Sequence, residues 1–193
     1  MAETEPVAAR LLRGDSGLTD LIDARDLPKH DQRFEVLGAL DEASSALGVA
    51  RAVSTRSETR ALLLDIQRDL CWMMSELAVA RPALARAPAY ITPERLHALE
   101  QAFDALAAAY PSPPAFTVPG DSLVGALLHL ARSIVRRAER HVTRLAHAAP
   151  LPNPHILPYL NRLSTLVFVL ARAEEAEAGL AAPTLAHGTR GGL

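Results

Sequence analysis

The sequence predicts an all-α domain, an up-and-down bundle of five helices. Hydrophobic residues make up 49% of the 193 residues but aromatic residues only 4%, so Leu, Ala and Val must build the core. This mixture favours helices over sheets. Apolar residues recur at helical spacing in five segments, and no segment alternates as a strand would. The length suffices for one domain with a substantial core.

The N-terminal half is expected to contain an arm and the first two helices. Residues 1–31 lack helical periodicity and are expected to form an arm or loop. The first helix is predicted over 32–53, where apolar residues share one face. Ser57 is the expected N-cap of a second helix, which runs to about residue 80. A proline-containing connection follows this helix.

The third and fourth helices have clear start signals. Thr92 is followed by a proline and an acid, which is typical of a helix N-terminus, and this helix should stop before Pro111. After a proline-rich loop, Asp121 or Ser122 can cap a long helix that reaches about His147. The fifth helix is expected to begin near Leu157, because Pro158 fits only its first turn, and to end near residue 178. The bundle domain is therefore predicted over 32–178, and 179–193 is expected to be a flexible tail.

Composition excludes several classes of protein. The net charge of −2 gives no support for a nucleic-acid partner. No apolar stretch is long enough to span a bilayer, and the acidic start is unlike a secretory signal, so a cytoplasmic protein is expected. The single cysteine, Cys71, lies in an apolar run and is expected to be buried. Paired Glu-x-x-His motifs of a dimetal bundle are absent from the sequence, so no metal site made of protein side chains alone is predicted.

The predicted fourth helix carries an unusual charged stripe. At about 100° per residue, Arg132, Arg136, Glu139 and Thr143 lie in one row beside the apolar face. One interpretation is a solvated face with an Arg136–Glu139 pair. The other is a row of guanidinium groups facing a polyanion such as a phosphate chain. Periodicity alone does not decide between them.

Two further features bear on a site. Asp41 lies among small residues of the first helix, where it would pair with an arginine of the fourth helix or face water. The arm contains a glycine-rich segment that can cradle phosphate but lacks the ending of a Walker A loop. Its residues of interest are Arg13, Gly14, Asp15, Gly17 and Thr19. Lys29, the only lysine, follows this segment.

These segments together resemble the PduO-type ATP:cob(I)alamin adenosyltransferase family over about residues 13–178. The most specific block begins with the F-x-x-P-G that starts at Phe116 and continues through L-H-x-A-R and R-R-A-E-R of the fourth helix to Y-L-N-R-L-S, which contains Asn161. The G-x-x-D-E around Asp41, the I-Q-x-x-L of the second helix and the G-D-x-G-x-T of the arm also match the family pattern, and Lys29 stands where the family has a lysine.

The resemblance implies a ferritin-like, adenosyltransferase-like five-helix bundle that assembles as a homotrimer with sites between subunits. It implies transfer of the 5′-deoxyadenosyl group of ATP, with Mg²⁺, to the cobalt of the second substrate, cob(I)alamin. The arm and Lys29 would then bind triphosphate, Arg132 would pair with Asp41 across the interface, and Phe116 would lie against the lower face of the corrin. Arg136, Glu139 and Asn161, together with Arg132, would line the ATP pocket.

The sequence departs from the family pattern at several positions. Asp121 replaces the second glycine of P-G-G, Asp23 replaces a glycine after the arm loop, and Thr165 replaces an aspartate. An alternative is therefore a non-catalytic relative that binds corrinoid or nucleotide as a scaffold or regulator. The retained charged residues favour the enzyme, because a decayed site should lose its buried charges early.

Overall fold

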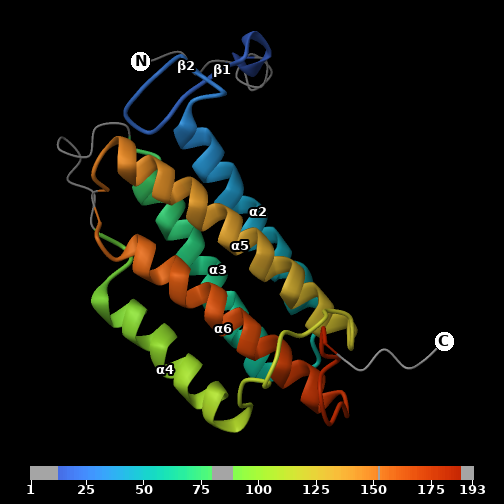
Figure 1. The fold of residues 1–193 in the computed structure, drawn as a ribbon. Helices are drawn as coiled ribbons and strands as arrows, with labels where there is room; N and C mark the ends of the chain where they lie inside the picture. The colour runs from blue at the N-terminus through green and yellow to red at the C-terminus, as the bar shows by residue number, and fades with distance from the viewer. Residues whose placement is uncertain (1–12, 80–88, 152, 188–193) are drawn as a thin grey trace.

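The computed structural model describes residues 13–79, 89–151 and 153–187, and its described part contains a bundle of five α-helices (Figure 1). The helices are α2 (Gln32–Val53), α3 (Ser57–Leu77), α4 (Pro93–Ala109), α5 (Leu123–Ala148) and α6 (Ile156–Glu177). Helices α2, α3, α5 and α6 pack together, while α4 packs along α6 at the edge of the bundle. The predicted all-α bundle is confirmed in the described residues.

The helix starts follow local capping chemistry. The Thr92 hydroxyl accepts from the backbone N–H of Arg95 at 3.4 Å, and the Ser122 hydroxyl accepts from that of Gly125 at 3.0 Å. Of the two caps considered for the fourth helix, Ser122 is thus the one used. Pro158 is the third residue of α6, within the first turn, where its missing N–H removes no intrahelical bond.

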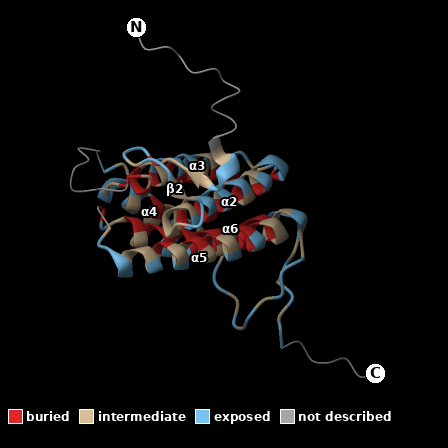
Figure 2. Ribbon diagram, turned by 90° about the horizontal axis from the view of Figure 1, so that it is seen from above, coloured by how far each residue is buried: buried red, intermediate tan, exposed pale blue. Residues whose placement is uncertain are grey.

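The core is aliphatic and lies between the inward faces of the helices (Figure 2). The predicted apolar face of α5 is fully buried, from Leu128 through Val135 to Val142. In α4 only Leu99 is buried, so this helix covers one side of α6 without completing the core. None of the helices in the described ranges combines the length and apolarity that a bilayer span requires.

Three sequence-based expectations need correction. The N-cap of α3 is Arg56 and not Ser57, and it makes no side-chain cap bond. Cys71 is exposed, because the buried positions of α3 around it are Leu70 and Met73, one residue before it and two residues after it. The arm contains a short antiparallel hairpin that we did not predict, β1 (Leu18–Thr19) with β2 (Leu27–Pro28). Each strand has only two residues, which is too short to show the alternation of apolar and polar residues that marks a strand in a sequence.

The predicted tail also departs from expectation. Residues after α6 turn back at Gly179, whose φ of +88° suits glycine, and Thr117 and Leu185 form an antiparallel bridge. The segment 184–186 is therefore paired with the loop before α5. The remainder of the predicted tail, 188–193, lies outside the described residues.

Candidate functional site

Lys29 closes the glycine-containing loop of the arm. After the 3-10 turn η1 (Arg13–Ser16), Gly17 adopts a φ of +77°, and the Lys29 backbone N–H donates to the Gly17 carbonyl at 2.9 Å. Lys29 Nζ donates to the Gly14 carbonyl at 2.7 Å. An ammonium group has three protons, so this bond occupies one of them. The structure thus gathers the predicted glycines and the only lysine around one loop.

The other predicted residues of this loop differ in their exposure to solvent. Asp15 is exposed and Thr19 is half-buried, while the side chain of Arg13 lies outside the described part of the structure. The Ile22 N–H donates to the Ala78 carbonyl at 3.1 Å, which ties the arm to the C-terminal end of α3. The loop therefore sits at the end of the bundle where α2 begins (Figure 1).

Arg132 differs from the other described residues of the α5 stripe because it has a buried donor without a partner. It is half-buried, and its guanidinium carbon lies 5.5 Å from the ring centroid of Phe168. Its Nε is buried and has no hydrogen-bond partner among the described residues. Burial, and then the charge of Arg136, lowers the pKa of Arg132. A buried donor without a partner is costly, so this Nε can donate to a group from outside the chain, such as an anion.

The rest of the stripe does not pair with itself. Arg136 is exposed and Glu139 is half-buried, and within the described ranges no ion pair joins them. The Thr143 hydroxyl donates to the Glu139 carbonyl at 2.8 Å, so the helix backbone satisfies it. The interpretation of the stripe as a salt-bridged solvated face therefore loses its main support.

Asp41 does not meet Arg132 within one chain. Asp41 is exposed on α2, and the described residues contain no ion pair between it and Arg132. Its neighbour Glu42 pairs instead with Arg137 of α5. Of the two interpretations from the sequence, Asp41 faces water in the single chain. A pair across a subunit interface stays a prediction.

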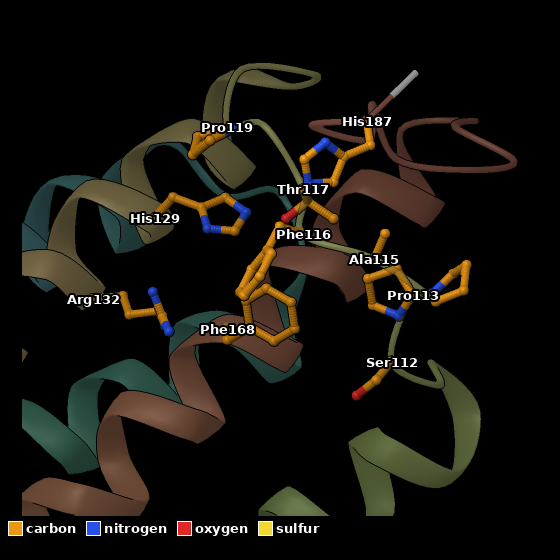
Figure 3. Close-up of a pocket in the computed structure, with 11 residues that line it drawn as sticks. Ser112, Pro113, Ala115, Phe116, Thr117, Pro119, His129, Arg132, Phe168 and His187 are labelled. Atoms are coloured by element: carbon orange, nitrogen blue, oxygen red, sulfur yellow. The ribbon is translucent and has the colours of Figure 1, made fainter. Parts of the chain in front are cut away.

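A cavity of about 560 Å³ (Figure 3) lies at the end of the bundle where α5 begins, and the arm lies at the other end, where α2 begins (Figure 1). Its walls come from the loop before α5, from α5 and α6, and from the segment after α6. The lining of the cavity includes Phe116, His129, Arg132, Phe168 and His187. The cavity thus combines two aromatic rings with one incompletely paired cation, while Phe116 itself is 82% exposed.

A buried polar cluster supports the α5 wall of this cavity. His129 Nε2 lies 3.6 Å from Glu175 Oε1, and its ring meets Phe168 edge to face at 5.7 Å between centroids. Arg172 pairs with the same glutamate. Burial lowers the pKa of His129, and the nearby carboxylate of Glu175 only partly opposes this effect. The imidazole is therefore neutral at pH 7, and its contacts with Glu175 and Phe168 hold it in place in the cavity wall.

Sequence reasoning missed three cavity residues. His129 stands inside the L-H-x-A-R motif, so that motif could have identified it. Phe168 looks like an ordinary core residue of the fifth helix, and only its contact with Arg132 distinguishes it. His187 falls in the predicted tail, where the sequence offers no signal.

The predicted site residues form two separate groups in one chain. Arg132 and Phe116 line the cavity, whereas Gly14 and Lys29 lie near the start of α2 at the other end of the bundle (Figure 1). A 22-residue helix such as α2 is about 33 Å long. Asn161 is exposed on α6 and does not line the cavity. One chain therefore does not bring the two groups together.

Other polar clusters of the bundle have structural partners. A second cavity, of about 400 Å³, lies between α3 and α4, where Asp69 pairs with Arg95 and accepts from the Tyr159 hydroxyl at 2.8 Å. Arg162 pairs with Glu100. Within the described ranges, no three His, Cys, Asp or Glu side chains are grouped as metal ligands.

Comparison with known proteins identifies a family. The sequence profile of the family described as cobalamin adenosyltransferase matches residues 11–174. A corrinoid adenosyltransferase PduO from Citrobacter freundii is 37% identical over 166 residues, which cover 86% of this chain and 49% of that protein. A corrinoid adenosyltransferase from Mycobacterium tuberculosis is 38% identical over 168 residues, covering 82% of this chain and 84% of the relative. The chain thus spans about half the length of the PduO relative and most of the other.

Solved structures agree with this likeness. A variant of a PduO-type ATP:corrinoid adenosyltransferase from Lactobacillus reuteri, complexed with cobalamin and ATP, superposes with a TM-score of 0.80 at 28% identity. The match covers 92% of this chain and 98% of that chain. Another variant from the same organism, complexed with ATP, gives a TM-score of 0.76 at 29% identity, covering 87% and 94% of the two chains.

Proposed function

Since this chain belongs to the cobalamin adenosyltransferase family, we propose that it transfers the 5′-deoxyadenosyl group of ATP to the cobalt of cob(I)alamin. The cobalt attacks C5′ of the ribose, a cobalt–carbon bond forms, the C5′–O bond breaks, and triphosphate leaves with the electron pair of that bond. The products are adenosylcobalamin and triphosphate. Both ATP, with Mg²⁺, and the corrinoid are substrates.

The observation that carries this proposal is Arg132 beside Phe116 on one cavity. The buried Nε of Arg132 has no partner in the described residues and can donate a hydrogen bond to a bound substrate. The aromatic walls of the cavity suit a large apolar face such as that of a corrin. In the proposed complex Phe116 lies against the lower face of the corrin, where it excludes the axial base. Four-coordinate cobalt is then easier to reduce.

The protein contributes alignment and charge neutralisation. The arm, 1–31, with Lys29 would hold the triphosphate, whose negative charge grows as the C5′–O bond breaks. Arg136, Glu139 and Asn161 would line the ATP pocket. Holding cobalt and C5′ in line converts a bimolecular encounter into an intramolecular step.

We further propose that the site forms between subunits of a homotrimer. Support comes from the separation of the two groups of site residues, which lie at opposite ends of the chain's own bundle. In such an assembly the arm of one subunit meets the cavity end of its neighbour, and the exposed Asp41 becomes the partner of Arg132. A reaction that consumes ATP also suits the cytoplasm.

The alternative, a scaffold that binds without turnover, rested on acids introduced near the nucleotide. Asp121 has a structural partner in the chain, because its carboxylate accepts two hydrogen bonds from Thr184. We therefore favour the enzyme.

The test is an anaerobic assay with reduced cobalamin, ATP and Mg²⁺, followed by the absorbance change to adenosylcobalamin. Turnover is expected for the wild type and should fall at least about a hundredfold in Arg132→Ala and Arg136→Ala, as expected when charged transition-state donors are removed. Arg68→Ala, which removes an exposed arginine of α3 paired with Asp65, is the matched control and should retain activity. Binding of ATP or cobalamin by calorimetry without any turnover would select the scaffold.

A further inference from the structure

The position of Phe116 is set by its backbone. The ring is 82% exposed, so packing in the chain cannot fix it. Its carbonyl accepts from the Ala186 N–H at 2.8 Å, and the Val118 N–H donates to the Thr184 carbonyl at 2.8 Å. Together with the Thr117–Leu185 bridge, these bonds hold three consecutive loop residues against the segment 184–186, which we name the strap.

The strap itself needs an anchor. A two-stranded contact of this length is marginal in water, because few backbone bonds oppose the entropy of ordering the chain. That anchor is Asp121, whose carboxylate accepts from the Thr184 N–H at 2.8 Å and from the Thr184 hydroxyl at 2.7 Å. Hydrogen bonds to a carboxylate are stronger than those between neutral groups. They also hold the pKa of Asp121 below its usual value.

The chain is shaped to bring these groups together. Gly120, with a φ of +136°, turns the loop just before Asp121, and Asp121 is followed by Ser122, the N-cap of α5. Gly179, with a φ of +88°, ends α6 and sends the chain back toward the loop. The anchor thus joins the strap to the start of the helix that carries His129 and Arg132. The strap in turn brings His187 to the cavity that Phe116 lines (Figure 3).

We propose that Asp121 is a positioning residue for the corrinoid, which holds the strap on the loop and thereby fixes the backbone of Phe116. This inference rests on the proposed function, in which Phe116 contacts the corrin. It also assigns a role to a residue that departs from the glycine of the family pattern. The charge at this position is then an adaptation for holding the loop, and it is not evidence of a decayed site.

Amide hydrogen exchange of the ligand-free protein tests the anchor without any reaction. Asp121→Ala should lower the protection of the Val118 and Ala186 amides by about tenfold, the effect of losing about one net hydrogen bond. Asp121→Asn keeps an acceptor oxygen and should restore part of the protection. Asp65→Ala removes a hydrogen-bonded carboxylate from the surface of α3 and is the matched control, with no change expected at either amide. Unchanged protection in Asp121→Ala would overturn the anchor.

The consequence for the corrinoid is tested by kinetics and by spectroscopy. Asp121→Ala should lower kcat/KM for cobalamin by about tenfold and leave KM for ATP unchanged, because the carboxylate of Asp121 bonds to Thr184 of the strap and not to a residue of the arm that is proposed to hold triphosphate. The fraction of bound cob(II)alamin that is four-coordinate, measured from its electronic spectrum with MgATP present, should fall in parallel and recover in Asp121→Asn. Lost amide protection with an unchanged spectrum and unchanged kinetics would overturn the positioning role. A wild type without turnover would refute the proposed function, while the exchange and spectral measurements would still decide the role of Asp121.

Discussion

Replacing Tyr159 by phenylalanine removes one hydroxyl from the interior of the bundle. Tyr159 is fully buried, and its hydroxyl donates at 2.8 Å to Asp69, which is 7% exposed and keeps Arg95 as its other partner. A hydrogen bond to a charged group contributes about 1.5–3 kcal/mol net, and Tyr159→Phe should lower the free energy of unfolding by that amount. For a domain of this size the loss corresponds to a Tm about 3–12 °C lower.

The chain offers a matched control for this substitution. The Tyr110 hydroxyl donates to Glu177 at 3.0 Å on the surface, so Tyr110→Phe should change stability by no more than about 0.5 kcal/mol. Urea unfolding at one protein concentration measures both variants. Equal losses in the two variants, or no loss in Tyr159→Phe, would refute the assignment of Asp69 and Tyr159 as a stabilising buried pair.

This pair also predicts an alkaline pH dependence. Burial, and then the charge of Asp69, raises the pKa of Tyr159 well above its ordinary value of 10.0. As the pH rises above 10.0, the tyrosine loses its proton more readily in the unfolded chain than in the folded one, so the free energy of unfolding falls. Tyr159→Phe should lack this part of the alkaline loss in urea unfolding at high pH.

Three further results are expected. Lys29→Ala removes the ammonium that bonds to the Gly14 carbonyl and should raise KM for ATP about tenfold or more, with KM for cobalamin unchanged in steady-state kinetics. An equal rise in both constants would contradict a triphosphate role. Phe116→Ala should lower kcat about tenfold or more and change the free energy of unfolding in urea by no more than about 0.5 kcal/mol, because Phe116 is 82% exposed. A large stability loss would show that the ring has a packing role. The pKa of His129 is lowered by burial from 6.5, so stability should fall as the pH drops below that value, when the unfolded chain takes up the proton first. His129→Gln should reduce this acid loss in urea unfolding, and an unaltered pH profile would contradict the assignment.

Local chemistry made most of the fold predictable. Thr92 and Ser122 mark helix starts because a hydroxyl must satisfy backbone donors there, and the apolar face of α5 follows from the helical period. The pairing of Thr117 with Leu185 was out of reach, because it joins residues far apart in sequence and spans only one bridge. The expectation that Cys71 is buried was wrong for a different reason. An apolar run on a helix points around the whole circumference, so only some of its members face the core.

The site was predictable in its parts but not in its arrangement. The row of Arg132, Arg136 and Glu139 follows from spacing alone, and in the structure Lys29 bonds to the glycine loop. No pattern along one chain could show that this loop lies at the opposite end of the bundle from the cavity that Phe116 and Arg132 line. The environment of Asp41 was equally hidden, since a residue that is exposed in one chain and paired in an assembly has the same sequence signal.

The products of the reaction test the proposed activity most directly. Wild-type protein should be mixed with cob(I)alamin and MgATP without oxygen, with adenosylcobalamin quantified by its light-sensitive absorbance and the phosphorus product identified by ³¹P NMR. We predict adenosylcobalamin and inorganic triphosphate in equal amounts. ATP cleaved to diphosphate and phosphate, or corrinoid and ATP recovered unchanged from a protein that binds both, would contradict the account.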